Sequence, residues 1–235
     1  MKTILKNGFD SLNIPYTEDM LDKFCEYSKL LIEWNEKMNL TAITDLNEIA
    51  VKHFLDCATI LTKTDLQGSI IDVGTGAGFP GMVIKILRPD LKITLLDSLN
   101  KRLVFLQEVK DKLGLKEVEI VHARAEDGGH NKNLREKFDF AVSRAVANLS
   151  TLSEYCIPFV KIGGCFVSMK GPDVTQELEE AKNAVTKLGG LVLKTEYINL
   201  PDTDINHSII TIKKERQTPT NFPRKAGKPS KEPLK

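Results

Sequence analysis

The sequence predicts an α/β fold: a Rossmann-like, seven-stranded, mostly parallel sheet with helices on both faces and an N-terminal helical extension. Two observations support this prediction. From residue 69 onward, short apolar runs alternate with helical stretches, which is typical of a parallel sheet covered on both faces. A glycine-rich loop directly follows the first apolar run, and this is the place where open α/β sheets bind nucleotide-like ligands.

The composition is that of a folded globular protein. Hydrophobic residues make up 41% of the 235 residues and charged residues 28%, which is ordinary for a chain with a real core. The N-terminus lacks an apolar run of signal-peptide length, and no stretch approaches the roughly 20 apolar residues that span a bilayer. We therefore expect a cytoplasmic protein without a membrane segment. The four cysteines form no C-x-x-C pair, so we expect neither a disulfide nor a metal site.

The N-terminal segment, residues 1–65, is expected to be helical and to pack on the core. Within residues 18–38, apolar side chains recur at steps of three and four, as on one face of a helix. Asp45-x-x-Glu48 resembles a capping box, and it predicts a second helix that runs to about Thr62.

The core is expected to span residues 66–214. Its seven predicted strands are residues 69–74, 93–97, 118–122, 138–143, 164–170, 191–198 and 207–214. Helices are predicted after Pro80 and over residues 100–113, 149–160 and 173–188. Because only a short polar link joins the last two strands, we expect them to form an antiparallel pair at one edge of the sheet.

The loop after the first strand reads Asp72-Val-Gly74-Thr-Gly76-Ala-Gly78. Glycine permits a sharp turn and lets a ligand approach the backbone. Continued to Gly81, the loop also satisfies the dinucleotide fingerprint G-x-G-x-x-G, but in a register that is late relative to the strand. The earlier acidic-x-Gly-x-Gly-x-Gly frame is typical of methyltransferases that use S-adenosylmethionine (SAM). SAM is therefore favoured over NAD, and a loop that only makes a tight turn is the remaining alternative.

Polar residues follow the other predicted strands at the same edge of the sheet. With Gly74, they are Asp97, Glu126, Arg144 and Lys170. A carboxylate at Asp97 can accept hydrogen bonds from the ribose hydroxyls of SAM or NAD alike, and the alternative role for Asp97 is to cap the helix that begins at Asn100. The alternation of strands and helices predicts that these five residues converge on one crevice.

The C-terminal tail, residues 215–235, contains four prolines and is not expected to form regular structure. Residues 213–235 hold eight basic and two acidic side chains. This imbalance favours a polyanionic partner, and a solvated tail that merely aids solubility is the alternative.

Motifs for several methyl-transfer chemistries are absent. The chain has no N-P-P-Y loop, which amino-group methyltransferases of adenine and cytosine use, and no Pro-Cys pair, which cytosine-C5 enzymes use. An acceptor with a free lone pair, such as guanine N7, needs neither a general base nor a covalent adduct. These absences favour a reaction that depends on positioning.

Seven blocks of the chain resemble the RsmG (GidB) family, the guanine-N7 methyltransferases of 16S ribosomal RNA, over nearly the whole length. The blocks are Trp34-Asn-x-x-Met38-Asn39-Leu40-Thr41, His53-Phe-Leu55-Asp56, Asp72-Val-Gly-Thr-Gly-Ala-Gly-Phe-Pro-Gly81, Leu95-Leu-Asp97-Ser98-x-x-Lys101-Arg102, Ser143-Arg144-Ala145, Lys170-Gly171 and Arg224-Lys-x-Gly227-x-Pro229-x-Lys231-x-Pro233-Leu234. The glycine loop combined with the Pro/Gly/Lys tail is more specific than either block alone.

The resemblance implies a class I SAM-dependent methyltransferase, with SAM as methyl donor and 16S ribosomal RNA or the small ribosomal subunit as partner. With the glycine loop, it predicts a cofactor site made by Gly74, Gly76, Gly78, Phe79, Asp97, Ser98, Ala125, Glu126 and Arg144. RNA is expected to bind Lys170, Arg224, Lys225, Lys228 and Lys231. Arg144 is expected to position the reactants, no residue is expected to act as general acid or base, and we expect a monomer.

Some alternatives remain open at the level of sequence. His53 is expected to be structural rather than catalytic, and Asn39-Leu40-Thr41 is expected to cap a helix rather than to lie at the cofactor mouth. Two other functions remain: a non-enzymatic RNA-binding or ribosome assembly factor that keeps a SAM fold, and an NAD-dependent oxidoreductase. A small-molecule methyltransferase is disfavoured by the basic tail.

Overall fold

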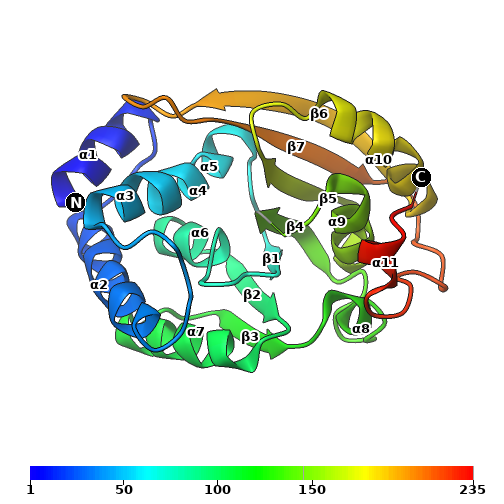
Figure 1. The fold of residues 1–235 in the computed structure, drawn as a ribbon, viewed down its shortest axis with the longest axis horizontal. Coiled ribbons are helices and arrows are strands. Elements are labelled where there is room, and N and C mark those ends of the chain that lie inside the picture. Colours follow the sequence, from blue (N-terminus) through cyan, green and yellow to red (C-terminus); the bar gives the residue numbers. More distant parts are fainter. Residues whose placement is uncertain (145, 235) are drawn as a thin grey trace.

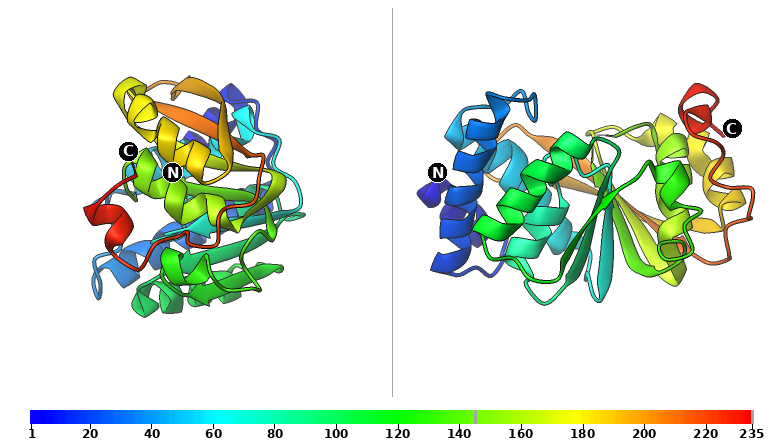
Figure 2. Two further views of the ribbon diagram at one scale, coloured as in Figure 1. Left: turned by 90° about the vertical axis from the view of Figure 1, so that its right-hand side faces the viewer. Right: turned by 90° about the horizontal axis from the view of Figure 1, so that it is seen from below.

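A seven-stranded sheet forms the centre of the protein, with helices on both faces (Figures 1 and 2). The computed structural model describes residues 1–144 and 146–234, so Ala145 of the Ser143-Arg144-Ala145 block and Lys235 lie outside the described residues. The strands are β1 (Ser69–Val73), β2 (Lys92–Asp97), β3 (Val118–His122), β4 (Phe138–Arg144), β5 (Val160–Lys170), β6 (Gly190–Asn199) and β7 (Asn206–Lys214).

The sheet has the order β3-β2-β1-β4-β5-β7-β6. The first five strands pair in parallel, which confirms the predicted parallel sheet. β7 runs antiparallel to both β5 and β6, so the predicted antiparallel pair does form one edge. The carboxyl ends of β1 to β5 therefore meet at the same edge of the sheet, as the alternation of elements predicted.

One face of the sheet is covered by α6 (Gly81–Leu87), α7 (Asn100–Lys112) and the N-terminal helices (Figure 1). Pro80 caps α6 at its N-terminal boundary. The helix thus begins directly after Pro80, as predicted, and the amide of Gly81, its first residue, donates a 2.8 Å hydrogen bond to the buried carboxylate of Asp72.

The other face is covered by α8 (Ala125–Gly128), α9 (Leu149–Cys156) and α10 (Thr175–Lys187). The prediction of a helix over residues 149–160 was wrong at its end. Pro158 lies in a short 3-10 turn, η2 (Ile157–Phe159), and β5 already begins at Val160. Since proline removes a helical hydrogen-bond donor, it ends the α-helix here.

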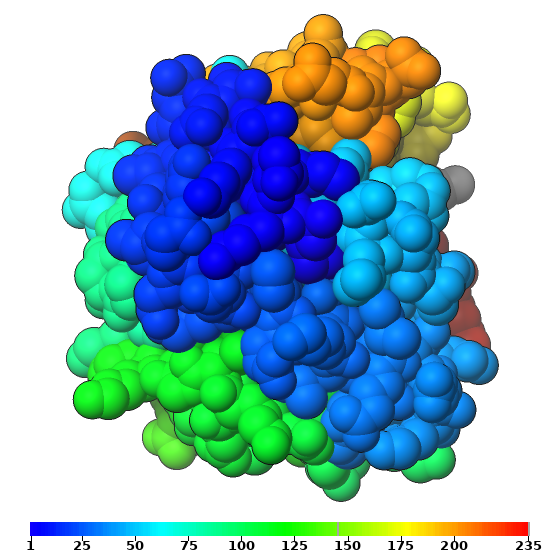
Figure 3. All heavy atoms as spheres, turned by 90° about the vertical axis from the view of Figure 1, so that its left-hand side faces the viewer, coloured from blue at the N-terminus to red at the C-terminus, as the bar shows by residue number. Residues whose placement is uncertain are grey.

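The N-terminal segment is helical as predicted, and Figure 3 shows it covering one end of the molecule beside α7. Its elements are α1 (Lys2–Ser11), α2 (Glu18–Asn35), α3 (Leu46–Ile49), the π-helical turn η1 (Ala50–Leu55), α4 (Asp56–Ala58) and α5 (Ile60–Lys63). α1 was not predicted separately, and α2 ends three residues before the predicted boundary. Aromatic rings join this segment to the glycine loop, with Tyr27 lying between Phe54 and Phe79.

The C-terminal tail folds back onto α8 and α9 instead of leaving the domain (Figure 2). It ends in a short helix, α11 (Lys228–Lys231), so the prediction of a tail without regular structure was wrong for these residues. The physical reason is anchoring: Pro229 is buried, and its carbonyl accepts a 3.0 Å hydrogen bond from the Thr151 hydroxyl. None of the helices in the described residues is both long enough and apolar enough to cross a bilayer.

Candidate active site

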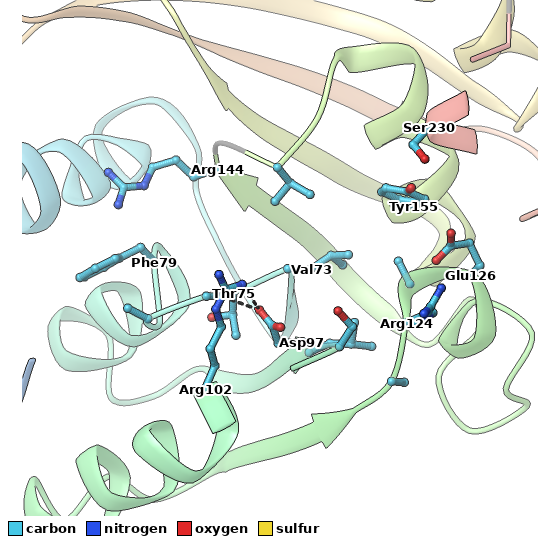
Figure 4. A pocket seen from close by; sticks show the side chains of 18 of the residues that line it. Val73, Thr75, Phe79, Asp97, Arg102, Arg124, Glu126, Arg144, Tyr155 and Ser230 are labelled. Atoms are coloured by element: carbon cyan, nitrogen blue, oxygen red, sulfur yellow. Dashed lines mark hydrogen bonds and ion pairs between the residues drawn. The ribbon is translucent and has the colours of Figure 1, made fainter. Parts of the chain in front are cut away.

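A cavity of about 600 Å³ opens at the carboxyl ends of the parallel strands (Figure 4). Its walls come from the loop after β1, from the ends of β2 to β4, and from parts of the N-terminal and C-terminal segments. Figure 4 shows Glu126 and Tyr155 at one end, and Phe79 and Arg144 at the other. The cavity is therefore elongated, with polar groups at both ends.

The glycine loop forms the floor between these ends. Gly76 has a φ of +60° and room for a ligand, since a Cβ atom there would meet nothing closer than 4.0 Å. Gly78, with a φ of +96°, faces the protein instead, where a Cβ would lie 2.4 Å from the Tyr27 hydroxyl. Gly76 thus leaves backbone open to a ligand, while Gly78 allows the loop to pack against α2.

Asp72 organises this loop from below. Its Oδ2 accepts hydrogen bonds from the Thr75 hydroxyl at 2.7 Å and from the Gly81 amide at 2.8 Å. Burial raises the pKa of Asp72 to about 7, although both of these hydrogen bonds oppose the shift. Asp72 is fully buried and does not line the cavity, so it shapes the loop without meeting a ligand.

Asp97 ends β2 at the middle of the cavity. Its Oδ2 accepts a hydrogen bond from the Gly76 amide at 2.9 Å, and its Oδ1 accepts one from Leu99 at 2.9 Å. Arg102 lies 3.4 Å from Oδ2. Asp97 therefore both braces the glycine loop and holds the turn before α7, and its side chain lines the cavity.

Glu126 marks the second polar end. It is 7% exposed, lies in the first turn of α8, and accepts a 2.8 Å hydrogen bond on Oε1 from the Gly227 amide. Gly227 and Ser230 also line the cavity, together with Tyr155 from α9. The C-terminal segment is thus part of the cavity wall.

Arg144 holds the opposite end through several contacts. Its guanidinium donates to the Asp56 carboxylate at 2.8 Å and to the Lys52 carbonyl at 3.0 Å. It lies 3.2 Å from Nδ1 of His53, and 5.1 Å from the centre of the Phe79 ring. Asp56 in turn lies 2.9 Å from Nδ1 of His207. These contacts fix the guanidinium, which is 16% exposed.

His53 is neutral at physiological pH. Burial, and next the charge of Arg144, lower the pKa of His53 to about 4, while Asp56 opposes the shift. The ring stacks on Phe79 with centroids 4.5 Å apart, and Nε2 lies 2.8 Å from the Thr41 hydroxyl. Because Nδ1 faces an arginine N–H, it acts as an acceptor.

Most of the predicted site converges. Eight of the nine predicted cofactor residues line the cavity, namely Gly74, Gly76, Phe79, Asp97, Ser98, Ala125, Glu126 and Arg144, whereas Gly78 lies behind it. His53 and Leu40 line the cavity as well, although the sequence favoured other roles for their motifs.

The residues predicted to bind RNA fall into two groups. Lys225, Lys228 and Lys231 are exposed on the C-terminal segment. Lys170 is paired with Glu177, with nitrogen and oxygen 2.6 Å apart, and Arg224 is paired with the buried Glu154.

The lining residues outside the predicted cofactor set include Tyr155, Gly227 and Ser230. Tyr155 carries no motif signal, because it belongs to an ordinary helix pattern. Gly227 did stand in the tail block that resembled a family, but the positive charge around it favoured an RNA-binding role for the whole block.

Comparison with known proteins gives the family. Residues 20–206 match the family model GidB, described as rRNA small subunit methyltransferase G. The chain belongs to this family. It is 51% identical to the ribosomal RNA small subunit methyltransferase G of Alkaliphilus metalliredigens over 236 residues, which covers 100% of this chain and 99% of that protein. The protein of the same name from Clostridium perfringens is also 51% identical, over 99% of this chain and 98% of its own length.

The fold is similar to that of a solved structure with bound AdoMet. A crystal structure of M. jannaschii TYW2 in complex with AdoMet aligns with a TM-score of 0.50 and 14% identity, over 62% of this chain and 68% of that one. Membership of the methyltransferase G family and the seven-stranded sheet confirm the predicted class I methyltransferase fold.

Proposed function

We propose that this protein transfers the methyl group of SAM to N7 of a guanine in bacterial 16S ribosomal RNA. The proposal rests on one continuous cavity. Asp97 lies at its middle, where a carboxylate can bind ribose hydroxyls, and the guanidinium of Arg144 lies at one end. The family supports a methyltransferase of small-subunit rRNA.

The residues of the cavity fit SAM. Gly76 leaves the open backbone that a large ligand needs, and Asp97 offers a buried carboxylate for ribose hydroxyls. Glu126 offers a second buried carboxylate, suited to the exocyclic amine of adenine. When bound, SAM supplies an electrophilic methyl group on a sulfonium.

The chain has to orient the acceptor and need not remove a proton. Guanine N7 has a free lone pair, so attack on the methyl carbon requires alignment within about 3–3.5 Å. His53 is neutral and stacked on Phe79, and a neutral ring tolerates the positive charge that the methylated base acquires. Methyl transfer breaks the carbon–sulfur bond, and its electron pair stays on sulfur.

Arg144 is the positioning residue of this proposal. It lines the main cavity and also a smaller neighbouring cavity of about 280 Å³, which Asp56, Lys170 and His207 help to form. The guanidinium therefore stands between the two spaces. It can orient a base that enters from the smaller one, by donating a hydrogen bond to a base oxygen.

We propose that the three exposed lysines, Lys225, Lys228 and Lys231, contact RNA phosphates. Arg224 and Lys170 belong to the same predicted set, but their charges are already paired within the domain. We further propose that the protein acts as a cytoplasmic monomer, which size-exclusion chromatography coupled to light scattering would check.

The test is methyl transfer from labelled SAM to small-subunit RNA or particles from a strain that lacks this gene, followed by nucleoside mass spectrometry. Label in 7-methylguanosine is expected. Asp97→Ala and Arg144→Ala should each abolish it while keeping a folded protein. Asp90→Ala is the matched control, because among the described residues Asp90 forms an ion pair with Arg88 alone, outside the cavity.

Two results would contradict the proposal. Label in another methylated nucleoside would show a different acceptor atom. SAM binding without transfer to free RNA or particles would instead favour the RNA-binding assembly factor.

A further inference from the structure

The C-terminal strap, defined here as residues 224–231, crosses the cavity at the end that holds Glu126. Its first residue is anchored strongly. The Arg224 amide donates to Glu154 at 2.7 Å, and the guanidinium reaches both carboxylate oxygens at distances from 2.7 to 3.1 Å. Glu154 is fully buried in α9. A buried carboxylate needs a charged or hydrogen-bonded partner, so Arg224 is bound to the protein rather than available to a phosphate.

The chain is also fixed just before the strap and within it. Before it, the Arg135 guanidinium donates to the carbonyls of Thr218 and Phe222, and Nε2 of His130 lies 2.7 Å from the Pro223 carbonyl oxygen. Within it, the Pro229 carbonyl accepts from Thr151. The strap therefore has one register on the domain.

Between these anchors, the strap faces the cavity. The Gly227 amide donates to Oε1 of Glu126 at 2.8 Å, and the Ser230 hydroxyl donates to the Gly227 carbonyl at 3.1 Å. Gly227 adopts a φ of +80°, which favours glycine. Figure 4 shows Ser230, Tyr155 and Glu126 gathered at this end of the cavity.

We propose that the strap is a wall of the cofactor site, in which Arg224 and Gly227 are positioning residues that hold Glu126 for the adenine of SAM. This inference rests on the proposed use of SAM. Gly227 occupies one carboxylate oxygen and fixes the orientation of the group, which leaves the second oxygen for the amine of adenine. Removing the Arg224 anchor frees the strap, so the cofactor loses both the wall and an oriented Glu126.

The experiment measures SAM affinity by titration calorimetry on the full chain without RNA, so that an effect on RNA binding cannot contribute. Arg224→Met should raise the Kd for SAM at least tenfold, and Arg224→Lys should restore part of the affinity. Arg216→Met is the matched control, because it removes the same side chain from the same segment. Among the described residues, the Arg216 guanidinium donates to the Thr186 carbonyl alone, outside the cavity, and the variant should bind SAM within twofold of wild type.

Two further variants separate the strap from a general loss of folding. Glu154→Met combined with Arg224→Met leaves no buried charge without a partner, and it should still raise the Kd at least tenfold. Ser230→Phe keeps the anchor but fills the cavity wall, and it should raise the Kd similarly. In turnover assays with saturating RNA, Arg224→Met should raise the KM for SAM and change kcat by less than twofold.

The outcomes are distinguishable. Wild-type affinity in Arg224→Met, in the double variant and in Ser230→Phe, while wild type binds SAM, would overturn the strap and leave the proposed function standing. Failure of the wild-type protein itself to bind SAM would overturn the proposed function, and the inference with it.

Discussion

At the scale of single residues, the site depends on charges that hold each other in place. Asp97 contacts the glycine loop, the turn before α7 and Arg102 with one carboxylate. An asparagine side chain at this position would keep only one of the two acceptor oxygens of Asp97. Its NH2 group would then face a backbone N–H, which is also a donor. A hydrogen bond to a charged acceptor contributes about 1.5–3 kcal/mol.

We therefore expect Asp97→Asn to weaken SAM binding by about 10- to 100-fold, measured by titration calorimetry. Asp90→Asn is the control on an exposed ion pair. Unchanged affinity in Asp97→Asn would show that this carboxylate does not hold the cofactor.

His53 predicts a pH dependence of stability. Its pKa is about 4 in the folded protein and about 6.5 when unfolded, so the unfolded state takes up the proton first as the pH falls. The stability that the neutral ring contributes is complete above pH 6.5 and is lost as the pH falls toward 4.

From pH 7 to pH 5, the free energy of unfolding should fall by about 1 kcal/mol more in the wild type than in His53→Gln, after allowance for solvent screening. Urea denaturation at the two pH values measures this difference. The neighbouring Arg144 and Asp56 remain in both proteins, so the comparison isolates His53. An equal loss in both would place the folded pKa near its ordinary value.

At the scale of elements, α2 packs against the glycine loop on the side away from the cavity. The Tyr27 hydroxyl is buried and donates to the Ala77 carbonyl within the loop. Tyr27→Phe removes this donor and leaves a buried carbonyl without it, which costs about 1–2 kcal/mol.

We expect Tyr27→Phe to lower the free energy of unfolding by that amount in urea denaturation. Tyr16→Phe should change it by less than about 0.5 kcal/mol, because its hydroxyl makes only a long, exposed bond to Asp10. Equal effects of the two substitutions would contradict a supporting role for α2.

The elements also show what the sequence could predict. The strands, their mostly parallel pairing and the convergence of Asp97, Glu126 and Arg144 follow from periodicity and from the rule that ligands bind at the carboxyl ends of strands. The roles of single side chains in the site depend on contacts between residues far apart in the sequence, and the local sequence pattern does not indicate these contacts. Gly78 faces Tyr27, which lies in a helix far away in the sequence. The sequence around either residue does not indicate this contact.

The tail shows the same limit more clearly. Its charge predicted contact with RNA, but the residue that fixes its path is Glu154, a buried acid 70 positions away from Arg224. Single-sequence patterns contain no information about such a partner. The polyanion-binding surface that the charge pattern indicates therefore stays a prediction, and it now concerns the exposed lysines Lys225, Lys228 and Lys231.

At the scale of the whole molecule, the strap has two faces. Its inner face lines the cofactor cavity, while Lys225, Lys228 and Lys231 are exposed. If these lysines neutralise phosphates, the logarithm of RNA affinity should fall with the logarithm of salt concentration by about 0.7 for each single-strand contact. Replacing all three by glutamine should then reduce the slope by about 2.

Fluorescence anisotropy with a small-subunit RNA fragment, from 50 to 300 mM salt, measures the slope. The control replaces Lys23 and Lys29 of α2, and Lys37 just after it, by glutamine, which changes the net charge equally on another part of the surface. Equal salt slopes in the two triple variants would mean that RNA affinity depends only on the net charge of the protein, and not on these three lysines. A smaller slope in the strap variant alone, with unchanged SAM affinity in the absence of RNA, would place RNA on the outer face of a segment whose inner face holds the cofactor.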